Sequence, residues 1–142
     1  MQGCRGCDLV EKENLNNLII ENRHAKAVFS DSFREGHCVI YLKKHKKSIS
    51  EIDINEYNSI FELIIKVSKA LEKKYDCEKT YLLSIGDKVE HIHFHLIPKH
   101  KDKCSMGIYC FEKLQEVEGE RKPSDSELNA LANEIKKIIE SS

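Results

Sequence analysis

The segment His91-Ile92-His93-Phe94-His95-Leu96-Ile97-Pro98 alternates imidazole and apolar side chains. Successive side chains of a β-strand point to opposite faces, so this pattern predicts a strand with three histidines on one face and apolar residues on the other. We expect the strand to span residues 89–97 and to end at Pro98. The apolar face can pack on the core and leave the imidazoles for ligands. An exposed polar face or an incidental metal site is the alternative, which three histidines in strict alternation disfavour.

Imidazole suits phosphoryl chemistry because it titrates near neutral pH. A neutral ring can attack phosphorus, whereas a protonated ring can stabilise phosphate charge or donate a proton to a leaving group. Since three rings cannot all approach one phosphorus atom in the same way, the row predicts a division of roles among them.

Strands and helices are also predicted on both sides of this segment. Asp53 and Glu56 form a capping box, and apolar residues at helical spacing continue the helix to about Tyr75. Ser124 and Glu127 form a second capping box before a C-terminal helix. Further strands are predicted at residues 18–21, 25–30, 37–42 and 80–85, whereas residues 107–114 fit more than one structure. This order predicts one α+β domain over residues 1–142, with a largely antiparallel sheet.

The composition excludes several classes of protein. Lys and Arg number 23 against 24 Asp and Glu, a balance that argues against a general nucleic-acid binder. The sequence has no apolar run near the roughly 20 residues of a membrane span, and its start does not resemble a signal peptide. We therefore expect a cytoplasmic protein without a membrane partner. Its six cysteines are then expected to be thiols or metal ligands, with Cys38, Cys77, Cys104 and Cys110 as small packing residues.

The pattern His-φ-His-φ-His-φ-φ, where φ is apolar, resembles the signature of the histidine-triad (HIT) family, and HIHFHLI fits it at every position. Gly36-His37, followed by a strand and Lys43-Lys44-His45, resembles a second family segment. Cys4-x-x-Cys7 resembles the cysteine pair that opens many bacterial members. The similarity runs from about Cys4 to about His100. It implies a five-stranded sheet with a long central helix and a C-terminal helix, the sheets being joined across a homodimer.

The resemblance also implies roles for the histidines. His93 matches the nucleophile that attacks the α-phosphorus of a nucleotide and forms a nucleotidyl-histidine, with its other ring nitrogen donating to the carbonyl of His91. His95 and His37 match residues that contact the phosphate. The implied activity is hydrolysis or transfer at the α-phosphate of purine nucleoside phosphoramidates or related conjugates. Hydrolysis or phosphorolysis of dinucleoside polyphosphates and nucleotide binding without catalysis are the alternatives.

Cys4, Cys7, His45 and His91 match the zinc ligands of the metal-containing branch of the family. Two cysteines and two histidines are a complete tetrahedral set without an open position, so such a zinc would be structural. It would fix the N-terminus to the strand that carries the nucleophile. A redox pair and two unliganded thiols are the alternatives, although the cysteines have no βαβ context.

The sequence departs from the family pattern at two places. The residue expected to hold the ribose hydroxyls is Ser30 or Asp31, depending on a one-residue gap. Gly86-Asp87-Lys88 stands where phosphoramidases have Gly-Gln-Ser/Thr, so that Lys88 would favour a more highly charged substrate such as a polyphosphate. His24, His100 and the Lys43–Lys47 run are expected to be solvated.

Overall fold

The computed structural model describes residues 3–32, 34–101 and 123–142, and its centre is one antiparallel five-stranded sheet. The strand order in the sheet is β1-β2-β3-β5-β4. The strands are β1 (Leu18–Glu21), β2 (Ala25–Phe29), β3 (Cys38–Leu42), β4 (Lys79–Leu83) and β5 (His93–Lys99). The α+β prediction is therefore confirmed, with strand limits that shift by a few residues.

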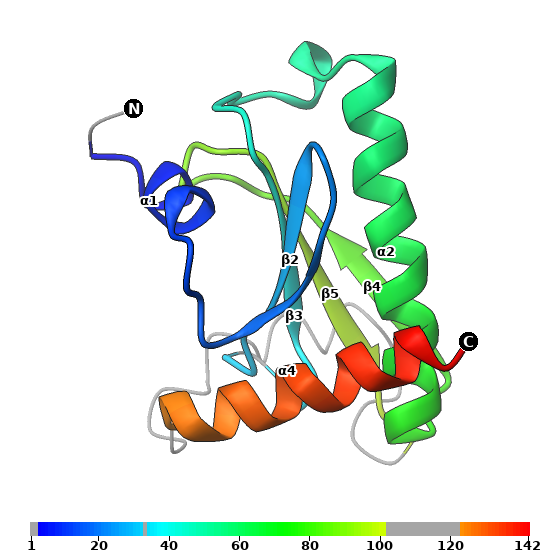
Figure 1. Cartoon of the computed structure of the whole chain (residues 1–142). Coiled ribbons are helices and arrows are strands. Elements are labelled where there is room, and N and C mark those ends of the chain that lie inside the picture. Colours follow the sequence, from blue (N-terminus) through cyan, green and yellow to red (C-terminus); the bar gives the residue numbers. More distant parts are fainter. Residues whose placement is uncertain (1–2, 33, 102–122) are drawn as a thin grey trace.

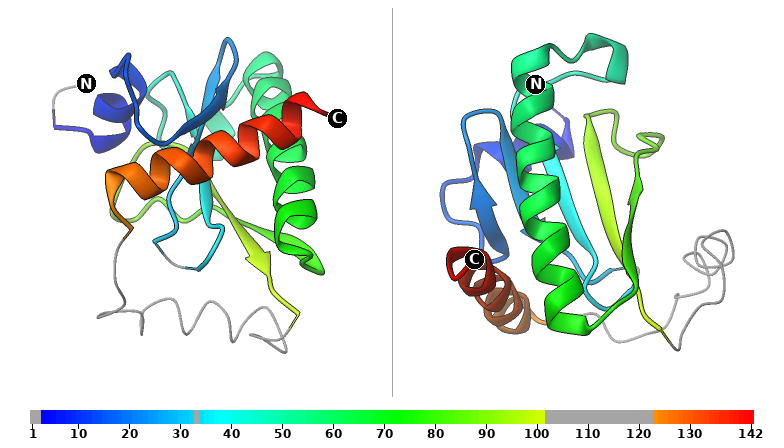
Figure 2. Two further views of the ribbon diagram at one scale, coloured as in Figure 1. Left: turned by 60° about the horizontal axis from the view of Figure 1, so that its bottom comes forward. Right: turned by 90° about the vertical axis from the view of Figure 1, so that its right-hand side faces the viewer.

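Helices cover both faces of this sheet. The long helix α2 (Ile54–Tyr75) runs along one face, and the C-terminal helix α4 (Asp125–Glu140) crosses beside it against β1 and β2 (Figure 1). A short helix, α1 (Arg5–Glu11), lies on the opposite face, where it contacts β3 (Figure 2). A single 3-10 turn, Ile49–Glu51, precedes α2. No helix in the described ranges is long and apolar enough to cross a membrane.

The two long helices begin where the sequence predicts. The Asp53 carboxylate accepts from the backbone N–H of Glu56 and the Glu56 side chain accepts from that of Asp53, which completes the capping box of α2. Ser124 caps α4 by accepting from the N–H of Glu127. The helix α2 ends at Asp76, whose φ of 47° is left-handed and stops the helical hydrogen bonding.

The core lies between the sheet and α2, because alternate strand residues face that helix. The side chains of Ile92, Phe94 and Leu96 belong to this buried cluster, as the alternation predicted. The cluster also includes inner residues of β1, β2 and β3, one face of α2 and two residues of α4, among them Ile19, Ala25, Ala27, Phe29, Ile40, Leu42, Ile60, Leu63, Val67, Leu71, Ala132 and Ile135. The histidine face of β5 is therefore turned away from α2.

The predicted limits of β5 are wrong at both ends. The strand begins at His93 instead of Val89, because the backbone of Ile92 bonds outside the regular ladder, to the carbonyl of Lys46 (2.8 Å) and the N–H of Leu42 (3.1 Å). It continues through Pro98, which pairs with β4. The pairing with β3 ends at Leu96, before Pro98. The missing N–H of this proline therefore removes no hydrogen bond between β5 and β3.

Other predictions fare differently. The helix α1 occupies an N-terminal segment for which the sequence indicated no helix. Cys38 and Cys77 are buried, as expected of packing residues. Residues 107–114, Cys104 and Cys110 lie outside the described residues.

Candidate active site and metal centre

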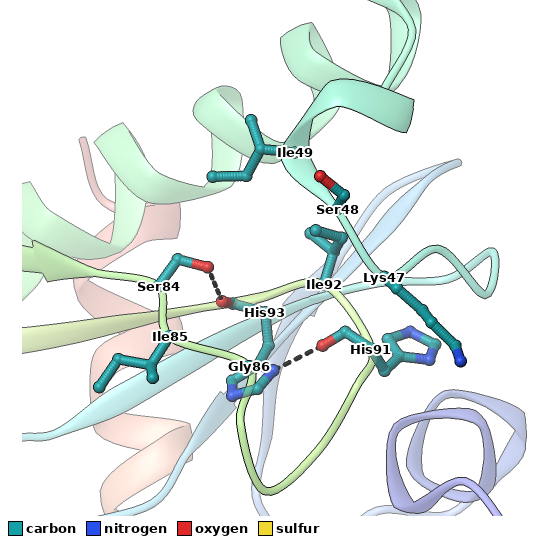
Figure 3. Close-up of a pocket in the computed structure, with 9 residues that line it drawn as sticks. All are labelled: Lys47, Ser48, Ile49, Ser84, Ile85, Gly86, His91, Ile92 and His93. Atoms are coloured by element: carbon teal, nitrogen blue, oxygen red, sulfur yellow. Dashed lines mark hydrogen bonds between the residues drawn. The ribbon is translucent and has the colours of Figure 1, made fainter.

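His93 stands at the start of β5, and only 8% of it is exposed. Its Nδ1 lies 2.6 Å from the carbonyl oxygen of His91 (Figure 3). A carbonyl can only accept, so Nδ1 must carry the proton and donate it. In the neutral ring, Nε2 is then left with a free lone pair. The backbone of the preceding residues thus selects the tautomer in which Nε2 is the nucleophilic nitrogen.

The three histidines of the motif share one side of the sheet, as predicted. The rings of His93 and His95 have centroids 5.0 Å apart. Tyr41 of β3 touches the rings of both His93 and His91, at centroid distances of 5.4 and 6.4 Å. The His91 ring nevertheless belongs to a different cluster, because it turns toward α1.

His37 joins the row from the residue before β3. Its Nε2 lies 2.9 Å from Nδ1 of His95, so one of these nitrogens donates to the other. Burial, helped by the adjacent His95 and His93, lowers the pKa of His37 to about 3, and burial together with His93 lowers the pKa of His95 to about 4. Both rings are therefore neutral hydrogen-bonding groups near neutral pH.

An open pocket of about 250 Å³ adjoins His93. It is formed by the turn that follows β3, the loop that follows β4 and the approach to β5, namely Lys47, Ser48, Ile49, Ser84, Ile85, Gly86, His91, Ile92 and His93 (Figure 3). The Ser84 hydroxyl donates to the carbonyl of His93 at 2.9 Å and so fixes this loop to the start of β5. The His93 ring thus has open space beside it, large enough for a small chemical group.

The loop before His37 carries both residues that the sequence proposed for the ribose. The Asp31 carboxylate accepts from the N–H of Gly36 at 2.7 Å, and the Ser30 hydroxyl lies 2.6 Å from that of Ser32. The N–H groups of Ser30 and Asp31 both donate to the carbonyl of His37 at 2.9 Å. These bonds close the loop on itself beside the imidazole row.

The prediction that His100 is solvated is wrong. It is 8% exposed, packs edge-on against Tyr75 and has its Nε2 2.7 Å from the carbonyl of Glu35. It therefore holds the loop between β2 and β3 that also carries Ser30 and Asp31. Its burial depends on α2 and on the pairing of β3 with β5, which brings the loop of Glu35 to the end of β5 and which local sequence does not reveal.

Lys88 is exposed and makes no ion pair within the described part of the chain; Glu90, its possible partner, pairs with Lys47 at 3.2 Å.

The lysine run of residues 43–47 is only partly solvated. The ammonium of Lys46 is partly buried against Glu56 of the α2 capping box.

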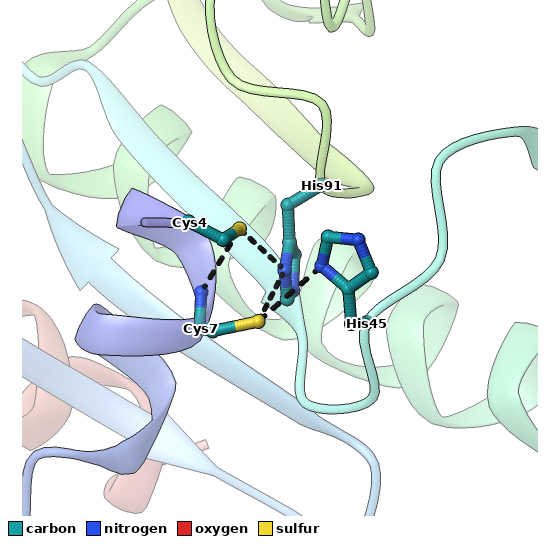
Figure 4. A group of neighbouring side chains, drawn as sticks. All are labelled: Cys4, Cys7, His45 and His91. Atoms are coloured by element: carbon teal, nitrogen blue, oxygen red, sulfur yellow. Dashed lines mark hydrogen bonds between the residues drawn. The ribbon is translucent and has the colours of Figure 1, made fainter. Parts of the chain in front are cut away.

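Cys4, Cys7, His45 and His91 form one cluster, whose possible ligand atoms all lie within 4.8 Å of one another (Figure 4). The Cys7 sulfur lies 3.3 Å from Nδ1 of His45 and 3.6 Å from Nδ1 of His91, and the Cys4 sulfur lies 3.5 Å from the latter nitrogen. The Nε2 of His91 donates to the carbonyl of Leu42 at 2.5 Å, which turns the lone pair of Nδ1 toward the thiols. Burial also lowers the pKa of His91. The donor set and the tautomer both fit a tetrahedral zinc.

Two residues that the sequence analysis missed hold α1 at this cluster. A Cβ on Gly6 would lie 2.4 Å from Cγ of His91, so only glycine allows the helix to approach that ring so closely. The buried ammonium of Lys26 donates to the carbonyls of Val10 (2.7 Å) and Lys12 (2.9 Å) at the C-terminal end of the helix. The glycine between the two cysteines could have indicated this close packing from the sequence, whereas nothing in the sequence indicated the role of Lys26.

Comparison with known proteins identifies related sequences. A family model described as the HIT domain matches residues 11–102. An uncharacterized HIT-like protein of Methanocaldococcus jannaschii is 25% identical over 103 residues, which cover 69% of this chain and 80% of that protein. Adenosine 5'-monophosphoramidase of Schizosaccharomyces pombe is 28% identical over 75 residues, which are 52% of this chain and 56% of the yeast enzyme.

Solved structures share the fold at low identity. A zinc-bound histidine triad family protein from Mycobacterium smegmatis superposes with a TM-score of 0.72 at 16% identity, covering 98% of this chain and 94% of that one. Plasmodium falciparum diadenosine triphosphate hydrolase superposes with a TM-score of 0.71 at 18% identity, covering 91% and 80%.

Proposed function

Because the chain belongs to the HIT domain family, we propose that it is a nucleotide hydrolase or nucleotidyl transferase that acts at the α-phosphate through a covalent nucleotidyl-His93. The observation that carries this proposal is the bond from Nδ1 of His93 to the carbonyl of His91, because it leaves Nε2 as an unprotonated nucleophile next to an open pocket. Substrates of the phosphoramidate class are favoured, in line with the name of the fission yeast relative.

In the proposed reaction, the lone pair of Nε2 forms a bond to the α-phosphorus, and the bond from phosphorus to the leaving group breaks. The leaving group departs with the electron pair and takes up a proton. Water then attacks the same phosphorus, loses a proton, and displaces the imidazole with its lone pair restored. Nδ1 keeps its proton throughout, because the carbonyl of His91 accepts it.

His37 and His95 are proposed to bind the phosphate oxygens. Since burial keeps both rings neutral, they offer N–H donors without a permanent charge. An arriving phosphate anion would favour protonation of one of them, which strengthens its hydrogen bond as negative charge develops on the oxygens. Ser30 or Asp31, on the adjoining loop, is proposed to meet the ribose.

We propose a structural zinc at Cys4, Cys7, His45 and His91. When bound, zinc would cross-link these four side chains without an open position for substrate. The close packing of Gly6 on His91 and the directed lone pair of that histidine support the proposal. The Mycobacterium smegmatis protein of the same fold is zinc-bound.

A homodimer is proposed from the surface opposite α1. The strand β4 is an edge of the sheet, and Leu82 and the nearby Ile85 are 43% and 61% exposed. On α2, Ile54 and Ile65 are also exposed, at 67% and 51%. Among the described residues β4 has no strand on its outer side, and such an edge beside exposed apolar side chains favours a second chain as a neighbour.

A second candidate activity is the cleavage of dinucleoside polyphosphates, as the name of the Plasmodium falciparum structure suggests for that protein. The cation Lys88, in place of a neutral hydroxyl residue, favours it.

One experiment separates these possibilities. The protein is incubated with nucleotides and adducts labelled at the α-phosphate, and quenched samples are analysed for acid-labile label on His93. Label from adenosine phosphoramidate would support the first activity and label from polyphosphates the second, whereas binding without label would leave a nucleotide-binding protein.

A further inference from the structure

Tyr41 is an aromatic residue that directly covers the proposed nucleophile. It stands opposite His93 in the pairing of β3 with β5, so both side chains lie on the same face of the sheet. The two rings are stacked, with centroids 5.4 Å apart and planes inclined by 22°. The same tyrosine meets the His91 ring at 6.4 Å and 60°. It therefore touches the reacting ring on its flat side and does not line the pocket.

The charge of His93 changes during the proposed reaction. The form of the ring that attacks has a proton on Nδ1 and a lone pair on Nε2. Once Nε2 has bonded to phosphorus while Nδ1 keeps its proton, the ring carries a positive charge that is shared by the two nitrogens. His93 is 8% exposed, so water gives this charge little solvation.

The face of an aromatic ring attracts a cation within about 6 Å of its centroid. The stacked ring of Tyr41 fulfils this condition for His93. On its other side Tyr41 pairs with Lys26, but that ammonium donates to two carbonyls of the α1 terminus and lies 3.8 Å from Glu21. The ammonium of Lys26, which is the cation next to Tyr41 across the sheet, is therefore held at the end of α1 and does not occupy the face of the Tyr41 ring.

We propose that Tyr41 is a positioning residue that holds the plane of the His93 ring and, through its π face, stabilises the positive charge that forms on this ring when Nε2 attacks phosphorus. This inference rests on the proposed function for its biological meaning. It concerns the reactivity of the imidazole toward phosphorus, which can also be measured without a nucleotide.

The test is a series of substitutions at position 41 in the full-length protein. Tyr41→Phe keeps the ring, Tyr41→Leu removes it, and phenylalanine analogues with one, two or three ring fluorines weaken the π face at nearly constant shape. The rate of covalent labelling of His93 is measured by rapid quench with adenosine 5'-phosphoramidate and, separately, with inorganic phosphoramidate. We expect Tyr41→Phe to react within about twofold of the wild type and Tyr41→Leu about tenfold more slowly, with a stepwise decrease along the fluorine series.

Equal rates for Tyr41→Phe and its fluorinated forms would overturn the charge stabilisation, because a purely packing role is insensitive to fluorine. The geometry is checked by NMR: the carbon-bound protons of the His93 ring should show a ring-current shift that Tyr41→Phe keeps and Tyr41→Leu loses. A wild type without this shift would overturn the stacking. If inorganic phosphoramidate labels His93 with the fluorine trend but no nucleotide does, the inference stands and the proposed function fails.

Discussion

Acid should destabilise this fold through His37, which is buried and neutral. Its folded-state pKa is about 3, whereas an unfolded histidine has its ordinary value of 6.5. Below that value the unfolded chain binds a proton that the folded chain rejects, so stability falls as the pH falls. Between about pH 7 and about pH 5, this one residue should remove roughly 2 kcal/mol from the free energy of unfolding, and the loss should level off only near the folded pKa.

The assay is urea unfolding followed by circular dichroism at the two pH values, for the wild type and for His37→Gln. Glutamine keeps a hydrogen-bonding group but does not titrate, so the variant should lose about 2 kcal/mol less than the wild type over this interval. The comparison cancels contributions from any metal ligand, because both proteins contain the same ones. Equal losses for the two proteins would refute the assignment of acid sensitivity to His37.

The remaining predictions concern catalysis, metal and specificity. His93→Ala should abolish nucleotidyl transfer but not AMP binding, with a stability loss of roughly 1–2 kcal/mol because the ring is buried; turnover at the wild-type rate would disprove its role. Elemental analysis of protein prepared without chelators should find one equivalent of zinc, and chelation should lower the Tm and speed hydrogen exchange in α1; metal-free protein would contradict this site. Gly6→Ala should weaken zinc binding about tenfold, since its Cβ would overlap His91, whereas the exposed Arg5→Ala should not; equal affinities would be contrary evidence. Lys88→Ser should slow polyphosphate cleavage severalfold more than phosphoramidate cleavage, and equal effects on both would reject a role for this cation.

Much of the row of His91, His93 and His95 could be predicted from the sequence, because the alternating pattern that indicates it is local. The alternation of residues 91–97 fixes which side chains share a face, and the apolar members do enter the core. The start of β5 could not be predicted in this way. The alternation continues without a break through Ile92, whose hydrogen bonds to Lys46 and Leu42 depend on a segment that is distant in the chain.

The residues that were missed owe their positions to contacts between distant segments. Local sequence predicts His100 as a loop histidine, because only the pairing of β3 with β5 brings it against the loop of Glu35. Local sequence predicts Lys26 as an ordinary exposed strand residue, because no neighbouring residue indicates that the C-terminal end of α1 will pack against it. The stacking of Tyr41 on His93 requires the register of β3 against β5, which no local pattern specifies.

The candidate metal site of Cys4, Cys7, His45 and His91 also has a consequence for how the protein is made. Cys4 and His91 are 87 positions apart in the chain. At a translation speed of about 5–20 residues per second, the two thiols leave the ribosome roughly 4 to 20 s before the last histidine of the set. During this interval they have no complete binding site, and they are open to oxidants and to other metal ions. The four side chains can come together only after the chain has been synthesised as far as His91, just before β5, so a correctly loaded metal would be a record that the other four strands of the sheet have already been made.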